Sequence, residues 1–304
     1  MSDHRVIDMR VHCVTVPARA VHSHGSGDVG GINAALCELI TDTGLTGWGE
    51  ASPWPVFTGT MEGNAAALHV HLRPHVIGRD PVLVEPIMTD ADRVLVGHNE
   101  AKAALECALL DLTGKIAGLP IAELVGGRHR DSNSLSFSVA NPDFDADLDD
   151  IAAIWDSGVR LFKLKTGFAD HAFDLMRLEK LRRIYGDDAR LRIDYNQGLP
   201  AYDAIRHIRD LETFRPDFVE QPVRMHEREA LADMTRALDV PIMADESVFD
   251  VRDATRGAAA RIANIFSLKT AKSGGIRRCL EIAAVARSAG IEVYGGCMFE
   301  TSIA

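Results

Sequence analysis

The chain has 304 residues, of which 46% are hydrophobic and 25% charged, and its formal net charge is −11. This length predicts two domains or one large barrel, and the ordinary composition argues against a disordered, collagen-like or coiled-coil chain. No apolar run reaches the roughly 18 residues of a membrane-spanning helix, so we expect no membrane association. The acidic balance argues against nucleic-acid binding, which requires a basic surface.

The N-terminal residues and the cysteines predict a cytoplasmic protein. Residues 1–5 contain no apolar core of the kind found in a secretory signal peptide. The five cysteines are odd in number and scattered, and no two of them form a CxxC pair. This distribution is typical of reduced thiols in a cytosolic enzyme.

The first 130 residues follow an α+β pattern, with strands first and helices after. The expected strands are residues 6–16, 35–41 and 46–50, the last two joined as a hairpin by a turn at residues 42–44. The clearest helix is expected at residues 99–117, because apolar side chains recur there at i, i+3 and i+4 until a glycine and a proline. We therefore expect a separate α+β domain at residues 1–130.

Residues 131–304 show a different pattern, in which short apolar runs alternate with helical stretches. The runs are residues 135–139, 161–165, 191–194, 218–220, 242–245, 265–269 and 291–295. Seven such units favour a β/α barrel. A doubly wound open sheet is the alternative, although the glycine-rich turn that it uses to bind a dinucleotide is missing after the first run.

Five successive runs end in an ionisable side chain. The five are Lys165, Asp194, Glu220, Asp245 and Lys269, spaced 29, 26, 25 and 24 residues apart. In a β/α barrel the carboxyl ends of the strands meet at one mouth, where active sites are built. Charges crowded there are costly unless they are paired or bind a metal ion, so the series predicts a functional site.

The residue types in this series predict its chemistry. Three carboxylates offer hard oxygen ligands suited to Mg²⁺ or Mn²⁺, and no cysteine or histidine joins them, which argues against zinc. Lys163 and Lys165 point the same way, because strand side chains alternate. A lysine close to another cation has a lowered pKa and can act as a base. The set suits removal of the proton α to a metal-bound carboxylate.

The segments around these residues resemble the enolase superfamily, and within it the muconate lactonizing enzyme (muconate cycloisomerase) subgroup. The matching barrel segments are residues 162–165, 192–197, 219–222, 241–247 and 265–275, in the family's order. Gly47-Trp48-Gly49-Glu50 and residues 124–128 resemble that family's capping domain. The resemblance implies an α/β fold: a modified TIM-type (β/α)7β barrel with an N-terminal α+β capping domain.

The resemblance also implies roles for individual residues. The implied metal ligands, for Mg²⁺ or else Mn²⁺, are Asp194, Glu220 and Asp245. Lys165 and Lys269 are implied as acid/base groups on opposite faces of the substrate, and Lys163 as a support for Lys165 and the substrate carboxylate. The implied second-layer or substrate-contacting residues are Asn196, Glu246 and Glu300.

Two loops of the first domain are expected to cover the barrel mouth and to set substrate choice. One is residues 22–28, with His22 and His24, and the other is residues 52–59, with Trp54 and Phe57. Glycines around aromatic residues suit a mobile lid. The alternative is that both are ordinary turns of the capping domain.

The expected activity is that of a muconate cycloisomerase acting on a small carboxylate, in a homo-oligomer. The alternative is a racemase, epimerase or dehydratase of an amino-acid derivative such as a proline betaine, a hydroxyproline or a dipeptide. The mandelate racemase subgroup is disfavoured, since it places a histidine at a strand end and no barrel histidine lies there. A metal-free Schiff-base lyase and a protein that only binds are the other classes.

The end of the chain predicts an incomplete barrel. The sequence stops at residue 304, just after the seventh run, whereas the family's barrel has eight strands and a C-terminal segment that completes the capping domain. We therefore expect the barrel to be truncated after its seventh strand, with strand edges left unpaired.

Overall fold

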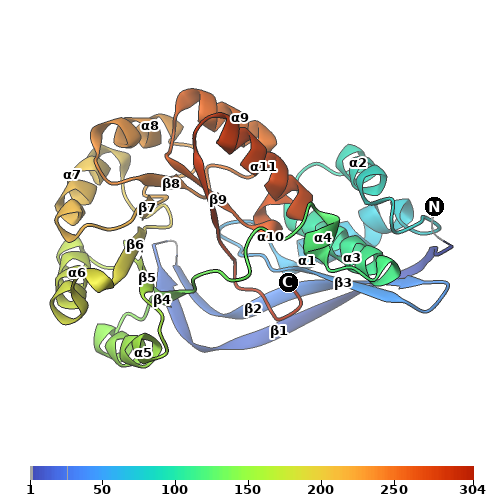
Figure 1. Cartoon of the computed structure of the whole chain (residues 1–304), viewed down its shortest axis with the longest axis horizontal. Coiled ribbons are helices and arrows are strands. Elements are labelled where there is room, and N and C mark those ends of the chain that lie inside the picture. The colour runs from blue at the N-terminus through green and yellow to red at the C-terminus, as the bar shows by residue number, and fades with distance from the viewer. Residues whose placement is uncertain (1–2, 26) are drawn as a thin grey trace.

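A computed structural model of the chain describes residues 3–25 and 27–304. Ser26, which belongs to the first of the two expected loops, lies outside the described residues. Figure 1 shows two units, a long antiparallel ribbon with a few helices and a curled sheet surrounded by helices. No helix among the described residues is long and apolar enough to cross a membrane.

The N-terminal unit is built on a three-stranded antiparallel sheet. Its strands, in spatial order, are β1 (Val6–His24), β2 (Gly27–Thr41) and β3 (Thr46–Ala51). The hairpin between β2 and β3 confirms the expected turn at residues 42–44. However, β1 and β2 extend well beyond the expected strands and pair as far as His24 and Gly27.

Most of residues 22–28, expected as a loop, belong to the end of this ribbon. His22 pairs with Val29, and Ser23 with Asp28, so the segment is the end of a β-hairpin. The sequence there is polar and rich in glycine, and it lacks the alternation that marks a half-buried strand. Backbone pairing between the two strands extends the ribbon all the same.

The helices of this unit pack against the sheet. They are α1 (Met61–Ala66), the π-helical η1 (Ala67–Leu72), the 3₁₀-helical η2 (Arg73–His75), α2 (Val84–Val94), α3 (Asn99–Ala117) and α4 (Ile121–Leu124). The bounds of α3 are those predicted, and Gly118 ends it in the left-handed region with φ 66°. Helix α3 lies directly on β3, because Gly47 and Gly49 have no side chain there: a Cβ on Gly49 would be 2.0 Å from the Ala104 carbonyl oxygen.

The second unit is a seven-stranded parallel sheet that curls on itself (Figure 1). Its strands are β4 (Ser136–Val139), β5 (Leu161–Lys165), β6 (Arg190–Asp194), β7 (Val219–Glu220), β8 (Ile242–Ala244), β9 (Ile265–Leu268) and β10 (Glu292–Gly295). Each strand pairs with the next along the chain, and β4 and β10 form the edges. This sequential order confirms the barrel architecture and excludes the doubly wound sheet, whose strand order reverses.

Helices follow the strands and cover the outside of the curled sheet. They are α5 (Phe144–Asp156), α6 (His171–Tyr185), α7 (Ala201–Leu211), α8 (Arg228–Ala237), α9 (Val251–Ala260), α10 (Thr270–Ser273) and α11 (Ile276–Ser288). Short 3₁₀ turns η3 (Gly186–Asp188) and η4 (Glu212–Phe214) end two of the connections.

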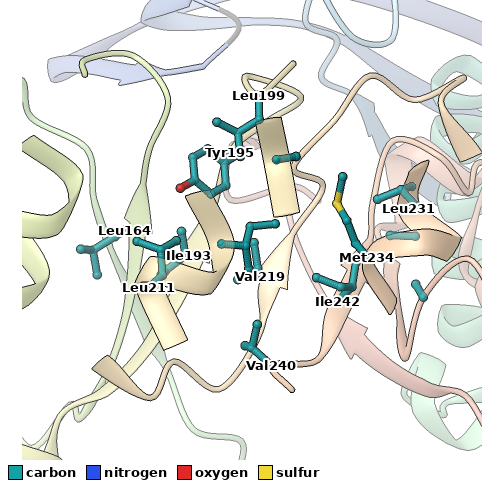
Figure 2. Packing of buried hydrophobic residues seen from close by; sticks show 14 of the residues in the cluster. Leu164, Ile193, Tyr195, Leu199, Leu211, Val219, Leu231, Met234, Val240 and Ile242 are labelled. Carbon is teal, nitrogen blue, oxygen red and sulfur yellow. The ribbon is translucent and has the colours of Figure 1, made fainter. Parts of the chain in front are cut away.

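The apolar core between strands and helices determines which side chains face the barrel interior. Figure 2 shows Ile193, Val219 and Ile242 of neighbouring strands among the side chains of the helices outside, and all three are fully buried. Because strand side chains alternate, the residues next to them, including Asp194 and Glu220, face the opposite way. The apolar layer therefore directs the charged series inward.

The two units have separate hydrophobic cores, and both polar and aromatic contacts join them. One core involves residues 6–112 and the other residues 139–286, and we propose that the domain boundary lies near residue 130 between them. The Asn99 side-chain amide donates to the Lys272 carbonyl at 2.9 Å, and the backbone N–H of Thr301 donates to Glu50 at 2.8 Å. In Figure 1 the β1–β2 ribbon extends from the helices of its own unit to β4 and β5 of the barrel.

Candidate active site

The residues of the charged series lie side by side at the carboxyl ends of neighbouring strands. Lys165 pairs in register with Asp194, and Asp194 with Glu220. Asp245 and Lys269 follow directly after β8 and β9. All five are at least nine-tenths buried, so the structure brings the predicted group together away from bulk water.

The two lysines of β5 bridge the first two carboxylates. Lys163 Nζ lies 2.6 Å from Asp194 Oδ2 and 2.8 Å from Glu220 Oε2. Lys165 Nζ lies 2.7 Å from the same Asp194 oxygen and 2.6 Å from Asn196 Oδ1. Both side chains point to the barrel interior, as the alternation of a strand predicts.

A second pair of lysines surrounds Asp245. Lys269 Nζ donates to Asp245 Oδ2, and Lys272 Nζ donates to Asp245 Oδ1 at 2.9 Å. Lys272 also donates to the carbonyls of Asp245 and Ser267, each at 2.8 Å, and is fully buried. The sequence interpretation assigned no role to Lys272, although its position three residues after Lys269 could have indicated that it lies close to the same site.

Two of the predicted supporting residues contact each other behind the lysines. The backbone N–H of Asn196 donates to Asp194 Oδ1 at 2.9 Å, and its side-chain amide donates to Glu246 Oε1 at 3.3 Å. Gln221, which the sequence interpretation missed, accepts from the N–H groups of Asp245 and Ser247 at 2.9 and 3.1 Å. These contacts hold the carboxylate of Asp194 and the chain around Asp245 in place.

A cavity of about 520 Å³ opens in front of this group. The polar side chains that line it include Lys163, Lys165, Asn196, Glu220, Lys269 and Glu300. From the capping unit, His22, Trp54 and Phe57 line the same cavity. A larger cavity of about 770 Å³ beside Glu50 and Thr301 shares only Glu300 with the predicted site residues, so the reacting groups converge on the smaller one.

Some predicted residues do not reach the cavity. Asp194 and Asp245 are fully buried and are not among the residues that line it, since the lysine side chains contact them directly. His24 stacks on Trp54, with ring centroids 4.8 Å apart, and lines a neighbouring hollow between the β1–β2 ribbon and residues 53–56. His24 therefore supports Trp54, which lines the cavity.

Two family models match the chain. Residues 147–304 match the model described as enolase C-terminal domain-like, and residues 6–126 match the N-terminal domain of the mandelate racemase / muconate lactonizing enzyme family. The chain belongs to the enolase superfamily. The match confirms the predicted family and extends over both units of the structure.

The relatives are isomerases of more than one kind. An L-Ala-D/L-Glu epimerase of Clostridium acetobutylicum is 33% identical over 97% of this chain and 83% of its own length. Muconate cycloisomerase 1 of Pseudomonas putida is 39% identical over 80% of this chain and 65% of its own length. The structure of a dipeptide epimerase of Enterococcus faecalis V583 with Mg and L-Leu-L-Tyr superposes with a TM-score of 0.91 at 29% identity, over 97% of this chain and 82% of that one.

These relatives define the reaction class. The chain is an enolase-superfamily isomerase, of the racemase/epimerase or cycloisomerase type. The predicted class of enzyme is thereby confirmed. The predicted preference for muconate over an amino-acid derivative is not, because epimerases and cycloisomerases both occur among the relatives.

Electrostatics distinguish the lysines of this enolase-superfamily site. Burial lowers the pKa of Lys165, and the charge of Lys163 adds to the effect. Burial also opposes the charge on Lys269, but Asp245 and Glu220 outweigh it and raise the pKa of that lysine. Burial, and after it the negative charge of Asp245, raises the pKa of Glu246 to about 8.

The donor set fits a divalent metal ion, although its carboxylates are paired with lysines. Among the described residues, no three histidine, cysteine, aspartate or glutamate side chains are grouped as a ready metal site. Burial raises the pKa of Glu220, and the negative charges of Asp194 and Asp245 raise it further, so a cation beside Glu220 would favour its charged form. Three oxygen donors on adjacent strands suit Mg²⁺ or Mn²⁺.

Helix α6 holds the end of β5 from behind. Arg177 is fully buried, and its Nη2 donates to the Lys165 carbonyl at 2.7 Å and to Asp174 Oδ1 at 2.6 Å. The other oxygen of Asp174 accepts from the Gly167 N–H at 3.3 Å. The sequence interpretation missed this pair, which holds the backbone of Lys165 and Gly167 in place.

The expected lid residues contact the barrel side of the cavity. The Phe57 ring centroid lies 5.1 Å from Lys269 Nζ, and Trp54 stacks on Phe299 at 5.4 Å. Thr58 of the same loop donates to Glu100 Oε1 at 2.7 Å. His22 packs edge-on against Phe299 at 4.9 Å, and burial lowers its pKa to about 4, so it is neutral at pH 7.

Proposed function

We propose that this chain transfers a proton at the carbon α to a carboxylate group of its substrate. The observation that carries this proposal is the arrangement of Lys165 and Lys269 around one cavity. They lie at the ends of β5 and β9, and the three strands between them carry the three carboxylates. Two amines that face one cavity from separate walls suit proton transfer at a carbon held between them.

The ligands of the proposed metal ion, Mg²⁺ or alternatively Mn²⁺, are Asp194, Glu220 and Asp245. When bound, the ion supplies positive charge beside the substrate carboxylate, where negative charge develops as the α-proton leaves. Lys163 lies between Asp194 and Glu220 and offsets part of their negative charge. Asn196 and Glu246 keep Asp194 oriented from behind.

The preferred specific activity is that of a muconate cycloisomerase. In the lactone-forming direction, Lys165 donates a proton to the enolate that ring closure creates, and in the reverse direction it removes the proton α to the carboxylate. Lys269 then acts through its charge. The 39% identity to muconate cycloisomerase 1 of Pseudomonas putida supports this assignment.

The second candidate is an epimerase or racemase of an amino-acid derivative such as a dipeptide. In this reaction one lysine removes the α-proton and the other delivers a proton to the opposite face. The placement of Lys165 and Lys269 on separate walls of the cavity is suited to it, and the 33% identity to the L-Ala-D/L-Glu epimerase extends over 97% of the chain.

Nuclear magnetic resonance in D₂O with Mg²⁺ tests the proposal and separates the two candidates. The substrate panel contains muconolactones, hydroxyprolines, betaines and dipeptides. Incorporation of solvent deuterium at the α-carbon is the expected result, and the identity of the product assigns the reaction. If no substrate exchanges its α-proton although Mg²⁺ binds, the proposal of an enolising enzyme is wrong.

Substitution of the two lysines should show which mechanism operates. Lys165→Ala should lower exchange by about 10²–10⁴-fold, the usual contribution of a general acid–base group. If Lys269→Ala retains exchange, the result supports the one-base cycloisomerase reaction. If Lys165→Ala and Lys269→Ala each lose exchange from only one enantiomer, the result supports the two-base reaction. Lys180→Ala, on the outer helix α6, is the matched control and should change neither rate.

Removal of the metal tests the ligand assignment. Treatment with EDTA should abolish exchange, and added Mg²⁺ should restore it in the wild type but not in Glu220→Gln. Exchange that persists in EDTA, together with trapping of a substrate adduct by borohydride, would instead indicate a Schiff-base mechanism at one of the lysines.

A further inference from the structure

Two residues of helix α3 in the capping unit bind the barrel segment that follows Lys269. The Asn99 side-chain amide donates to the Lys272 carbonyl at 2.9 Å. The carboxylate of Glu106 accepts from the backbone N–H of Arg277 at 3.2 Å. Because Asn99 and Glu106 are about two helical turns apart, both face the same side of α3, the side that lies against the barrel.

The bound segment, residues 270–277, determines where the second pair of lysines stands. It begins directly after Lys269 and contains the short helix α10, on which Lys272 lies. The N–H of Ser273 donates to the Lys269 carbonyl at 3.0 Å, which folds the segment into a compact turn. Lys272 Nζ in turn donates to the carbonyl and the carboxylate of Asp245. A displacement of this segment would therefore move both lysines relative to Asp245.

Glu106 is a buried carboxylate that binds backbone groups of the other unit. Only 2% of the residue is exposed. Burial raises the pKa of Glu106, and the N–H groups of Arg277 and Ile276 oppose this rise because they stabilise its charged form. The absence of a side chain at Gly275 permits the approach, since a Cβ there would lie 2.1 Å from Glu106 Oε2. The start of a helix favours negative charge, so Glu106 caps α11 from the capping unit.

We propose that Asn99 and Glu106 are positioning residues for Lys269 and Lys272, so that packing of the capping unit on the barrel sets the geometry of this lysine pair. One contact holds the 270–277 segment in its middle, and the other holds it at its end. Neither residue is among the described residues that line the active-site cavity. They therefore act through the segment and make no contact with the substrate.

Amide hydrogen–deuterium exchange followed by mass spectrometry tests whether the two contacts hold the segment. Asn99→Asp keeps the shape of the side chain but cannot donate to the Lys272 carbonyl, and Glu106→Gln removes the charge at the start of α11. In both variants the amides of residues 270–277 should exchange about three- to tenfold faster than in the wild type. Residues 161–168, which include β5, should be unchanged. Unchanged amide exchange at residues 270–277 in both variants would overturn the proposal.

The kinetics of α-proton transfer show whether the two contacts serve Lys269, and here the inference rests on the proposed function. In both variants kcat should fall by about tenfold or more, because a small displacement of a reacting group is costly, while KM should change by less than about twofold. If the reaction uses two bases, the loss should be confined to the enantiomer whose proton Lys269 removes. Wild-type kcat, or an equal loss for both enantiomers of a two-base reaction, would show that Lys269 is not the group they position.

Glu85→Gln is the matched control. Glu85 of α2 also joins the capping unit to Arg277, but through the half-exposed guanidinium at 3.0 Å and not through the backbone. The variant should match the wild type in amide exchange and in kcat. If it loosens residues 270–277 as much as Asn99→Asp does, any contact between the units has this effect and the specific role of Asn99 and Glu106 is wrong.

The two measurements fail independently of each other. If the wild type incorporates no α-deuterium from solvent, the proposed function is refuted, while amide exchange still decides whether Asn99 and Glu106 hold the segment. Unchanged amide exchange in the variants refutes the inference alone. Thermal melting identifies any variant that does not fold.

Discussion

The pKa values of single side chains in this site depend on burial and on neighbouring charges of both signs. Lys165 and Lys269 lie in equally buried positions, yet the pKa of one is lowered and that of the other is raised. Each contacts a carboxylate, Asp194 for Lys165 and Asp245 for Lys269, but burial and the charge of Lys163 prevail at Lys165, whereas Asp245 and Glu220 prevail at Lys269. The residue types were evident from the sequence, but their pairing was not, since each lysine–carboxylate contact joins different strands.

Arg177 is a residue whose importance follows only from its contacts. Arg177→Met removes the hydrogen bond to the Lys165 carbonyl and leaves the buried carboxylate of Asp174 unpaired. We expect a loss of about 3–5 kcal/mol in the free energy of unfolding, measured by urea denaturation. In the variant that remains folded at low temperature, exchange should slow more than KM changes, because the displaced group is Lys165.

The matched control for this substitution is Arg183→Met on the solvent side of the same helix. It should leave both stability and exchange within error of the wild type. If Arg177→Met is as stable and as active as the control, Arg177 does not position Lys165.

Glu100 should make the stability of the protein depend on pH. Burial raises the pKa of Glu100 from an ordinary value of 4.5 to about 7, against the hydrogen bonds from Thr58 and Asn64 that favour its charged form. The folded state therefore binds this proton more tightly than the unfolded state does. The resulting stability is complete below about pH 4.5 and is lost as the pH rises through 7.

Replacement of Glu100 by glutamine removes this titration. The difference in unfolding free energy between Glu100→Gln and the wild type should change by at most about 3 kcal/mol from pH 5 to pH 8, in favour of the variant. Urea denaturation at the two pH values measures it. Parallel pH profiles for the two proteins would show that Glu100 does not carry a raised pKa in the folded state.

At the level of elements, the bounds predicted from the sequence agree with the observed strands of the barrel, but not with the first two strands, β1 and β2. The expected barrel strands agree with the observed ones to within one or two residues, because each is a short apolar run bounded by turns. The β1–β2 ribbon continues through a polar, glycine-rich segment. The length of the ribbon is determined by pairing between residues on two strands, and a local sequence pattern does not predict such pairing.

The close packing of β3 on α3 gives a prediction at this scale. Gly49→Ala would place a Cβ within 2.0 Å of the Ala104 carbonyl oxygen, and backbone atoms cannot move aside as a flexible side chain does. The strand would have to shift away from the helix, and we expect a cost of at least about 2 kcal/mol in the free energy of unfolding.

Gly30→Ala provides the control, because Gly30 lies in β2 of the same sheet with nothing within 4 Å of the added Cβ. Thermal melting of the two variants should show a clearly lower melting temperature for Gly49→Ala alone. Equal melting temperatures would mean that β3 and α3 are not in close contact.

For the whole molecule, the active site depends on contacts between the two units. His22, Trp54 and Phe57 come from the capping unit, whereas the lysines and carboxylates come from the barrel. The tip of the β1–β2 ribbon reaches the barrel mouth, where Ser23 donates its N–H to the Ala140 carbonyl at 3.1 Å. The cavity is therefore closed only when the capping unit packs against the barrel.

Gly25→Ala tests the docking of this tip. A Cβ at Gly25 would lie 2.2 Å from the Tyr195 carbonyl oxygen, directly after Asp194. The tip should lift from the mouth, and the kcat/KM for proton exchange should fall by about tenfold or more, as small misplacements around a reacting group do. Unfolding free energy should change much less, and Gly30→Ala should match the wild type in both measurements. Wild-type kcat/KM in Gly25→Ala would contradict the docking.

The sequence by itself determined the fold class, the seven strands of the barrel and the chemical identity of the residues at their ends. It could do so because short apolar runs and their spacing are local properties, and because parallel strands bring their carboxyl ends to one edge. The tertiary structure decided which lysine contacts which carboxylate, where the β1–β2 tip docks, and that Arg177 supports the backbone of Lys165. Those features arise from contacts between residues distant in the chain, and their energies depend on burial that exists only once the barrel has formed.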